Sequence, residues 1–413
     1  MQVYLVGGSV RDALLGLPVR ERDWVVVGGT REELLRLNYR EVGRDFPVFL
    51  HPGTHEEYAL ARLERKVAPG YRGFAVEFGA QVTLEEDLAR RDLTINAIAQ
   101  AEDGSLIDPY GGKGDLESRT LRHVSEAFSE DPVRVLRVAR FAARFAPLGF
   151  RVAPETLGLM RDMVQRHEVD ALVAERVWQE SEKALREPAA STFFQVLRDC
   201  GALKSIYPEI DALFGVPQPP KWHPEIDSGV HTLMVLDQAV ALTDDVGARF
   251  AALVHDLGKA QTPPGEWPSH HGHEERSVEL IEGLAARLRV PSEYRNLALI
   301  VARFHGIVHR AFELKAKTLL DFMERADAFR RSERFALALL ACEADSRGRT
   351  GLETKPYPQR PYILAARDAA AAIRPSASDI AGQSGPQIAQ ALHDRRIRAI
   401  NEVRAAQPPP PAH

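Results

Sequence analysis

Short apolar runs separated by polar and glycine-rich segments characterise the first part of the chain. Up to about residue 125 these runs are rich in β-branched and aromatic side chains, which favours strands. Two further segments, beginning at Thr30 and Thr83, have the capping-box sequence that begins helices. The pattern therefore predicts a compact α/β head. Its predicted strands are Val3–Val6, Trp24–Val27, Phe46–Leu50, Tyr58–Leu63 and Phe74–Phe78.

The pattern becomes helical at Asp131, and no strand-like alternation is expected after that point. Asp131 suits the N-cap and Pro132 suits the first turn, so a helix is predicted to begin there. Four prolines within residues 215–224 cannot continue a helix and indicate a linker.

These changes predict an α+β chain in which the α/β head is followed by an all-helical remainder. The expected segments are a head at 1–125, a helical neck and body at 126–215, a histidine-rich helical domain at 225–330, a helical tail at 331–405 and a disordered proline-rich end at 406–413.

Composition narrows the class of protein. The 413 residues are 45% hydrophobic and 27% charged, as in ordinary soluble domains, and the net charge of −5 requires any nucleic-acid partner to bind a local basic patch. Two cysteines, Cys200 and Cys342, provide no disulfide framework, which favours the cytoplasm. No signal peptide is visible, and no apolar run is long enough to predict a membrane span.

The segment from Leu5 to Asp12 is a candidate phosphate-binding site. A predicted strand runs into Gly7-Gly8 and then into a helix start, where free backbone N–H groups suit an anion. Arg11 adds a positive charge one turn later. The alternative is a plain turn, because a lone Gly-Gly is a weak signal.

Glu21 and Asp23 lie close by in the sequence, beside the apolar run Trp24–Val27. At strand spacing, residues i and i+2 share a face, so the two carboxylates are expected to project together. Carboxylate oxygens are the ligands that Mg²⁺ prefers, which predicts a site for a metal-bound nucleotide triphosphate. The alternative is a solvated acidic pair.

Two arginine-rich segments follow. Arg91 lies among arginines and carboxylates of a predicted helix end, and it could grip a phosphate or simply belong to a salt-bridged helix. On the helix after Asp131, Arg134, Arg137, Arg140 and Arg144 fall on one face opposite an apolar face. Since no acid interrupts this row, we expect phosphates or base edges as its partners.

Asp131 and Arg134 could act together. A carboxylate acceptor and a guanidinium donor fixed side by side can read the Watson–Crick edge of a base by hydrogen bonding. The plain alternative for Asp131 is an N-cap, and the two roles are compatible.

Taken in order, these motifs resemble the class II tRNA nucleotidyltransferase and poly(A) polymerase family over roughly residues 1 to 150. The resemblance implies a polymerase-β-like head and the addition of C, C and A to tRNA from CTP and ATP. It assigns phosphate contacts to Gly8 and Arg11, and Mg²⁺ to Glu21 and Asp23. It also assigns nucleotide binding to Arg91, Arg137 and Arg140, and base selection to Asp131 and Arg134. Glu21 departs from the family pattern, which has aspartate there.

Histidines gather in the third predicted segment. His255-Asp256 follows an apolar run, and His231 lies upstream on a helical stretch. Imidazole and carboxylate can share one divalent ion. The arrangement resembles the HD phosphohydrolase superfamily, whose last aspartate is not obvious here; Asp321 and Asp345 are candidates.

The resemblance implies a divalent transition metal, such as Ni²⁺, on His231, His255 and Asp256. It also implies hydrolysis of 2′,3′-cyclic phosphates, 2′-nucleotides and other phosphoesters, with His255 and Asp256 as catalytic residues. This layout is similar to bacterial CCA-adding enzymes with an HD domain. Such a protein would work in the cytoplasm with tRNA, ATP and CTP as partners, no membrane, and a monomeric or homodimeric state. A degenerate HD domain that merely binds tRNA is the alternative.

Several other functions remain compatible with the sequence. A bacterial poly(A) polymerase shares the head motifs but lacks the HD region. A CC-adding enzyme differs in a loop that we would seek near Arg44-Asp45-Phe46. A non-catalytic tRNA-binding protein and an HD nucleotide hydrolase with a non-catalytic tRNA-binding head are further alternatives. Candidate tRNA-contacting residues in the body and tail are Arg198, Arg347 and Arg349.

Overall fold

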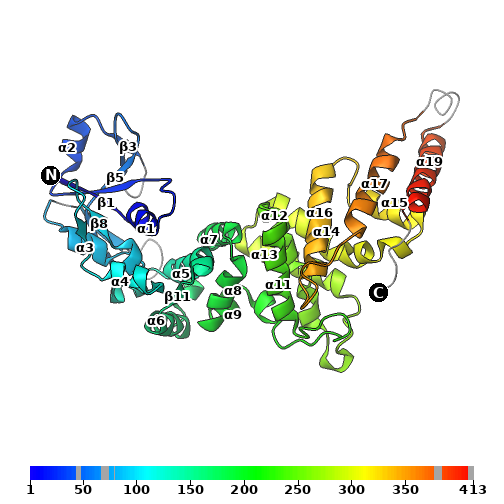
Figure 1. Cartoon of the computed structure of the whole chain (residues 1–413), viewed down its shortest axis with the longest axis horizontal. Coiled ribbons are helices and arrows are strands. Elements are labelled where there is room, and N and C mark those ends of the chain that lie inside the picture. The colour runs from blue at the N-terminus through cyan, green and yellow to red at the C-terminus, as the bar shows by residue number, and fades with distance from the viewer. Residues whose placement is uncertain (43–47, 67–73, 79, 376–383, 408–413) are drawn as a thin grey trace. The chain divides into compact units, whose positions relative to one another are not determined.

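The computed structural model describes residues 1–42, 48–66, 74–78, 80–375 and 384–407 (Figure 1). The chain forms two compact units, residues 1–206 and 207–413, which are described separately. The first contains a sheet and helices, and the second is helical among its described residues.

A seven-stranded sheet in the order β3-β4-β5-β2-β1-β8-β9 organises the first unit. Strand β1 (Gln2–Val6) runs antiparallel to β2 (Asp23–Val27), and this register pairs Val6 with Asp23. Strand β2 pairs in parallel with β5 (Glu57–Leu60). The remaining strands are β3 (Arg40–Val42), β4 (Val48–Leu50), β8 (Ala99–Gln100) and β9 (Leu106–Ile107).

The apolar run of β2 is explained by burial on both faces of the sheet. Successive strand residues point to opposite faces. Val25 packs with Leu88 of α3 (Leu84–Ala89), whereas Val26 packs with Leu34 of α2 (Arg31–Arg36). Because each face has its own apolar cluster, the strand cannot alternate between apolar and polar residues.

Most predicted elements of the head are confirmed. Strands over Val3–Val6, Trp24–Val27 and Phe74–Phe78 are present, and the threonines at 30 and 83 both form capping boxes. Of the predicted strand Phe46–Leu50, β4 covers the last three residues, and residues 46 and 47 lie outside the described chain, as does the loop segment 44–46.

The prediction of one strand over Tyr58–Leu63 is wrong. The chain leaves the large sheet after β5, and the backbone N–H of Ala61 donates to Val26 O at 2.9 Å. Strand β6 (Arg62–Lys66) then pairs with β7 (Phe74–Phe78) in a separate ribbon. The apolar pattern continues across this break, so the pattern alone does not reveal it.

Helices complete the first unit, and α5 packs against α7 and α8. The helices not yet given are α1 (Gly8–Leu14), η1 (Thr94–Asn96), α4 (Gly112–Glu117), η2 (Glu126–Glu130), α5 (Val133–Phe145), η3 (Ala146–Leu148), α6 (Pro154–Gln165), η4 (Glu168–Ala171), α7 (Ala174–Arg186), α8 (Ala190–Asp199) and α9 (Ala202–Ile206). The expectation of no strand after Asp131 is wrong at one place, because β11 (Arg151–Val152) pairs with β10 (Thr120–Leu121).

In the second unit α11, α12, α14 and α16 pack together (Figure 1). The predicted linker at 215–224 contains no helix, and its Pro217 forms a β-bridge with Asp227. Residues 408–413 of the predicted disordered end lie outside the described chain. The elements are α10 (Pro208–Asp211), α11 (Ser228–Leu242), α12 (Val246–Val254), η5 (Leu257–Gln261), η6 (Pro264–Glu266), α13 (His273–Leu288), α14 (Ser292–His309), η7 (Ala311–Glu313), α15 (Ala316–Arg325), α16 (Ser332–Arg347), α17 (Gln359–Ala372) and α19 (Gly385–Ala406).

Candidate functional site

The glycine pair after β1 brings a helix start, an arginine and a carboxylate together. Gly7 has φ +71°, a conformation that side chains disfavour, and a Cβ on Gly7 would lie 2.8 Å from Nη1 of Arg91. Since Val6 pairs with Asp23 across the sheet, the carboxylate begins β2 beside this turn. The sequence prediction that these elements meet is confirmed.

A pocket of about 490 Å³ opens at this point within the first unit, and nine arginines and three aspartates line it. The full lining is Gly7, Gly8, Arg11, Asp23, Arg62, Arg90, Arg91, Asp92, Asn96, Asp131, Arg134, Arg137, Arg140, Phe141, Arg144 and Arg176. It therefore includes every residue predicted to bind the nucleotide. Glu21 is exposed and is not part of this lining. The excess of guanidinium groups suits a polyanion.

Arg11 is held in a buried network rather than projecting freely. Its Nη2 lies 2.7 Å from Oδ1 of Asp12, and its Nη1 donates to Oδ1 of Asn96. Its guanidinium also lies over the rings of Phe141 and Phe145. Burial lowers the pKa of Arg11, and the Asp12 carboxylate opposes this effect. The side chain is thereby fixed in one orientation.

Arg91 offers an unsatisfied donor. Its Nη1 donates to the carbonyl of Asn96 at 3.2 Å, and its Nη2 lies 3.2 Å from Asp87. Among the described residues, nothing accepts a hydrogen bond from its buried Nε. An anionic ligand could supply the missing acceptor.

The row of arginines on α5 is anchored by acids from other elements. Arg137 pairs with Asp92 at 2.7 Å, and Arg140 pairs with Glu180 of α7 at 2.6 Å. The arginine face of α5 therefore has acidic partners, although no acid lies within the row itself. Its partners are distant in the sequence, so the helix alone could not reveal them. The Asp92 carboxylate raises the pKa of Arg137. Burial alone would raise the pKa of Asp92, but Arg137 holds it well below its usual range.

The predicted base-selecting pair lies in the pocket, and the backbone N–H of Arg134 donates to the carbonyl of Asp131 at 3.0 Å. Arg134 is buried and donates to the carbonyls of Ala127 and Arg90, each at 2.6 Å. Asp131 accepts from the backbone N–H of Val133 at 3.1 Å, but the N-cap of α5 is Pro132, so the helix begins one residue later than predicted. Both carboxylate oxygens of Asp131 also accept from Arg176, at 3.1 and 2.8 Å.

Arg176 was not identified from the sequence. It lies on α7 in a segment without a recognisable motif, and only its contact with Asp131 draws attention to it. The sequence likewise assigns no separate role to Asp12, Asn96 and Glu180, although Asp12 ends the candidate phosphate-binding segment.

The acidic pair has the chemistry of a Mg²⁺ site. Asp23 is the first residue of β2, and Glu21 precedes the strand. Partial desolvation raises the pKa of Asp23, Arg91 lowers it, and the neighbouring Glu21 carboxylate raises it again. Mutual repulsion between two carboxylates is relieved by a cation, so these residues fit Mg²⁺.

In the second unit, histidines and aspartates from α11, α16 and the end of α12 converge. Nε2 of His231 on α11 lies 3.1 Å from Oδ1 of Asp345 on α16. Nε2 of His255, at the end of α12, lies 3.1 Å from Oδ2 of Asp256 and 3.6 Å from Oδ1 of Asp345. His231, His255 and Asp345 form a buried group that could hold a metal ion. Of the two candidates for the last aspartate, Asp345 lies here, and Asp321 belongs to none of the metal-compatible groups among the described residues.

Backbone carbonyls select the histidine tautomers at this centre. Nδ1 of His255 lies 2.7 Å from Ala252 O, and Nδ1 of His231 lies 3.0 Å from Gly348 O. Each Nδ1 therefore carries a proton in the neutral ring, which leaves Nε2 as a metal ligand. Among the described residues, no partner hydrogen-bonds to the buried Nε2 of His255. These residues fit a divalent ion.

The charge balance also favours a cation. Burial alone would lower the pKa of His255, but Asp256 and Asp345 raise it to about 10. The pKa of Asp345 is held well below its usual range by His255 and His309, against the effect of burial. In the absence of a metal, a proton on His255 offsets the two carboxylates.

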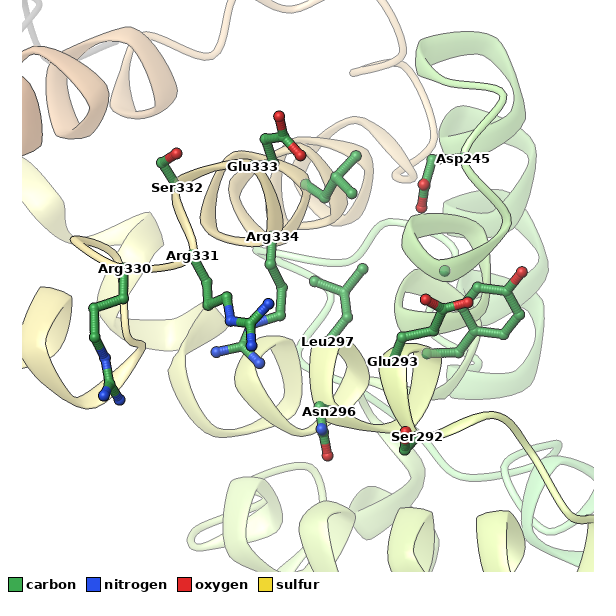
Figure 2. Close-up of a pocket in the computed structure, with 13 residues that line it drawn as sticks. Asp245, Ser292, Glu293, Asn296, Leu297, Arg330, Arg331, Ser332, Glu333 and Arg334 are labelled. Atoms are coloured by element: carbon green, nitrogen blue, oxygen red, sulfur yellow. The ribbon is translucent and has the colours of Figure 1, made fainter.

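Two hollows among the described residues of the second unit differ in their lining. One, of about 420 Å³, is lined by His223, Lys259, His273 and Arg349 and by the exposed ring of Trp222, beside the histidine centre. The other, of about 790 Å³, is larger but carries no histidine. Figure 2 shows that Arg330, Arg331 and Arg334 lie on one side of it, whereas Asp245 and Glu293 lie on the other.

The candidate tRNA-contacting arginines of this unit have acidic partners. Arg347 pairs with Glu343 at 2.6 Å, and Nη2 of Arg349 lies 3.7 Å from Asp345. Arg198, in the first unit, is exposed near the end of α8.

Among the described residues, no helix combines the length and apolarity that a membrane span requires.

Comparison with known proteins gives consistent matches along the chain. The family model of the poly A polymerase head domain matches residues 3–122, that of a probable RNA- and SrmB-binding site of polymerase A matches 149–214, and that of the HD domain matches 229–349. The Multifunctional CCA protein of Thioalkalivibrio sulfidiphilus is 65% identical over 98% of this chain and 99% of its own. That of Methylococcus capsulatus is 61% identical over 99% and 96%.

Solved structures resemble the fold. A CCA-adding enzyme in complex with ATP has a TM-score of 0.66 at 20% identity and covers 98% of this chain and 88% of its own. A Thermotoga maritima CCA-adding enzyme complexed with tRNA has a TM-score of 0.61 at 19% identity and covers 98% and 91%.

Proposed function

The chain belongs to the family of multifunctional CCA proteins, and on that premise we propose that it adds and repairs the 3′-terminal CCA of tRNA from CTP and ATP, releasing pyrophosphate. The observation that carries the proposal is the convergence of the predicted nucleotide-binding residues on one arginine-rich pocket beside Asp23. The substrates place this work in the bacterial cytoplasm.

Different residues of the pocket bind the triphosphate and the metal ion. The Gly7-Gly8 turn with Arg11 and Arg91 holds the triphosphate, and Arg137 and Arg140 add positive charge along α5. Glu21 and Asp23 would hold Mg²⁺, which would supply activation of the tRNA 3′-hydroxyl and charge neutralisation of the pyrophosphate.

Base selection falls to Asp131 and Arg134. One carboxylate and one guanidinium present acceptors and donors to a base edge. Arg176 fixes the orientation of the Asp131 carboxylate through its two hydrogen bonds, which makes Arg176 a positioning residue. The carbonyls of Ala127 and Arg90 do the same for Arg134.

The second unit is proposed to hydrolyse phosphoesters, with 2′,3′-cyclic phosphates and 2′-nucleotides as substrates. His231, His255, Asp256 and Asp345 would hold a divalent transition metal, which would supply Lewis-acid activation of the phosphoester. Lys259 and Arg349 in the adjoining hollow are placed to bind the substrate phosphate. The domain boundaries stay as proposed, except that the HD region must extend past residue 330 to include Asp345.

The test uses tRNA that lacks its 3′ end, incubated with CTP, with ATP and with both. The proposal expects CC from CTP alone and complete CCA from both. Long A-tails would identify a poly(A) polymerase. Addition of CC without a terminal A under all conditions would identify a CC-adding enzyme. No product would indicate either a tRNA-binding protein or an HD hydrolase with a non-catalytic head. Hydrolysis of 2′,3′-cyclic nucleotides by the same preparation then tests the second unit.

A further inference from the structure

The hollow of about 420 Å³ beside the histidine centre contains an aromatic side chain to which the proposed hydrolysis gives no role. Trp222 lines this hollow and is 58% exposed. Among the described residues no aromatic ring contacts the indole, and the ammonium of Lys221 lies over it, 4.7 Å from the ring centroid. A single exposed apolar side chain is common on protein surfaces, so the position of this one in the hollow is the informative feature.

Hydrogen bonds hold the loop of Trp222 in one conformation. The backbone N–H groups of Trp222 and His223 both donate to the carbonyl of Pro219, each at 3.0 Å. At the base of the loop, the backbone N–H of Gln218 donates to the carbonyl of Ile226 at 2.7 Å. The indole is therefore presented by a folded loop, and little conformational entropy is lost when a ligand binds to it.

The next residue along the chain, His223, joins this loop to the histidine centre. Its ring lies edge-on to the ring of His231, with the centroids 4.6 Å apart. Nδ1 of His223 lies 3.1 Å from Oε1 of Glu225, and the same oxygen lies 3.0 Å from Nδ1 of His231. Trp222 is thus held one residue away from a direct contact with the proposed hydrolytic centre.

Gln218 adds a buried polar group without a partner. Its side chain lines the same hollow and is 1% exposed. The ammonium of Lys259 has only donors, so the amide oxygen of Gln218 accepts from it, and this bond fixes the orientation of the amide. Among the described residues, nothing accepts a hydrogen bond from the buried Nε2 of Gln218. An oxygen or ring nitrogen of a ligand would supply the missing acceptor.

The hollow therefore combines three kinds of group. Lys259 and Arg349 provide positive charge, Gln218 provides an unused donor, and Trp222 provides an aromatic plane. A phosphoester without a base would use the positive charge and leave the indole exposed. A nucleotide has a complement for each group, namely its phosphate, its ribose and base acceptors, and the π-face of its base. A volume of about 420 Å³ also lies within the range of small-molecule sites.

We propose that Trp222 is a stacking platform for the base of the substrate, so that the second unit hydrolyses nucleotides in preference to phosphoesters without a base. This inference rests on the proposed phosphohydrolase. The Nε2 of Gln218 donates to the same ligand. Stacking of a base on an aromatic side chain strengthens binding by about 5- to 150-fold, and every base has a π-face. The preference is therefore for the presence of a base, with little discrimination among the bases.

The test compares two substrates of the full-length protein, adenosine 2′,3′-cyclic phosphate and its abasic analogue, 1-O-methylribose 2′,3′-cyclic phosphate. The wild type should have a kcat/KM at least about fivefold higher for the adenosine ester. Trp222→Ala should raise the KM for this ester by a similar factor and leave kcat nearly unchanged, because the stacking is lost from the bound substrate and the transition state alike. Its KM for the abasic analogue should not change.

Two further substitutions at position 222 separate stacking from apolar bulk. Trp222→Phe keeps an aromatic face and should restore most of the preference. Trp222→Leu keeps an apolar side chain without such a face and should behave as Trp222→Ala does, which also provides a second variant if the alanine protein does not fold. Hydrolysis of the abasic analogue verifies the folding of the second unit in each variant.

Ile226→Ala is the matched control. Ile226 is 46% exposed in the same loop but does not line the hollow, and its hydrogen bond to Gln218 uses the backbone carbonyl. This variant should keep the wild-type KM for both esters.

The possible failures of the inference and of the proposed phosphohydrolase are distinguishable. If Trp222→Ala and Trp222→Leu weaken both esters equally, or change neither, the stacking platform is wrong and the proposed phosphohydrolase stands. If the wild type hydrolyses neither ester, the proposed phosphohydrolase is wrong, and the inference that rests on it is wrong as well.

Discussion

In both the arginine pocket of the first unit and the histidine centre of the second, neighbouring groups fix the orientation of the side chains that would bind a ligand. The two sites differ in the charge of the ligand that they suit. In the pocket, acids and carbonyls hold guanidinium groups in place, and the lining carries more positive than negative charges. In the centre, backbone carbonyls bind Nδ1 of His231 and of His255, so each Nε2 presents a lone pair to the centre. The first arrangement suits a triphosphate and the second suits metal ions.

The comparison predicts that the two sites fail independently, and Asp23→Ala should have the largest effect. Losing a metal ligand removes several kcal/mol of charge stabilisation, which corresponds to a loss of nucleotide addition of about 1,000-fold or more. The measurement is incorporation of labelled CTP into tRNA lacking its 3′ end. Phosphohydrolase activity serves as the control and should be unchanged. Full CCA addition by this variant would contradict the assignment of Asp23 as a Mg²⁺ ligand.

The converse variant is His255→Ala. Hydrolysis of a 2′,3′-cyclic nucleotide should fall by at least about 100-fold, because a buried metal ligand is lost. CCA addition should continue at the wild-type rate. If both activities fall together, His255 is structural and the two sites are not independent.

Arg176→Ala sharpens the comparison within the arginine pocket. Without its ion pair the Asp131 carboxylate can rotate, and discrimination by such a base contact is worth about 1–3 kcal/mol. We expect the ratio of correct to incorrect nucleotide addition to fall by about tenfold, with a smaller change in total addition. Arg186→Ala on the same helix, whose guanidinium pairs with Glu182 at 2.7 Å, is the control and should leave fidelity unchanged.

Glu21→Asp should have the smallest effect. A carboxylate is retained, and only its reach is shortened, so addition with Mg²⁺ should remain within about threefold of the wild type. Comparing rates with Mg²⁺ and Mn²⁺ in both proteins measures any change in metal preference. A loss comparable to that of Asp23→Ala would show that the longer side chain is required.

The sequence predicted what is encoded locally. The glycine pair after β1 and the two capping boxes each depend on neighbours within a few residues, and all are present. The helix predicted to begin at Asp131 has its N-cap one residue later, at Pro132. The meeting of Asp23 with the glycine turn depends on the antiparallel pairing of β1 with β2, which sets Val6 opposite Asp23.

What the sequence did not reveal depends on distant partners. Arg144 pairs with Asp12 132 positions away, so the α5 arginines had no visible acids. Asp345 contacts His231 across 114 positions, and no local pattern distinguished it from Asp321. Tyr58–Leu63 looked continuous because apolar residues serve both the large sheet and the ribbon that follows it.

The anchored arginines of the first unit have a consequence for affinity. A flexible side chain that becomes ordered on binding costs about 0.5–1.5 kcal/mol in lost rotamer freedom. Arg11, Arg134 and Arg137 already have fixed partners, so this entropy is lost during folding rather than when the nucleotide arrives. For three side chains the difference is roughly 1.5–4.5 kcal/mol, or about one to three orders of magnitude in affinity. The acids of this pocket thus make it a tighter receptor for phosphate by keeping it preorganised.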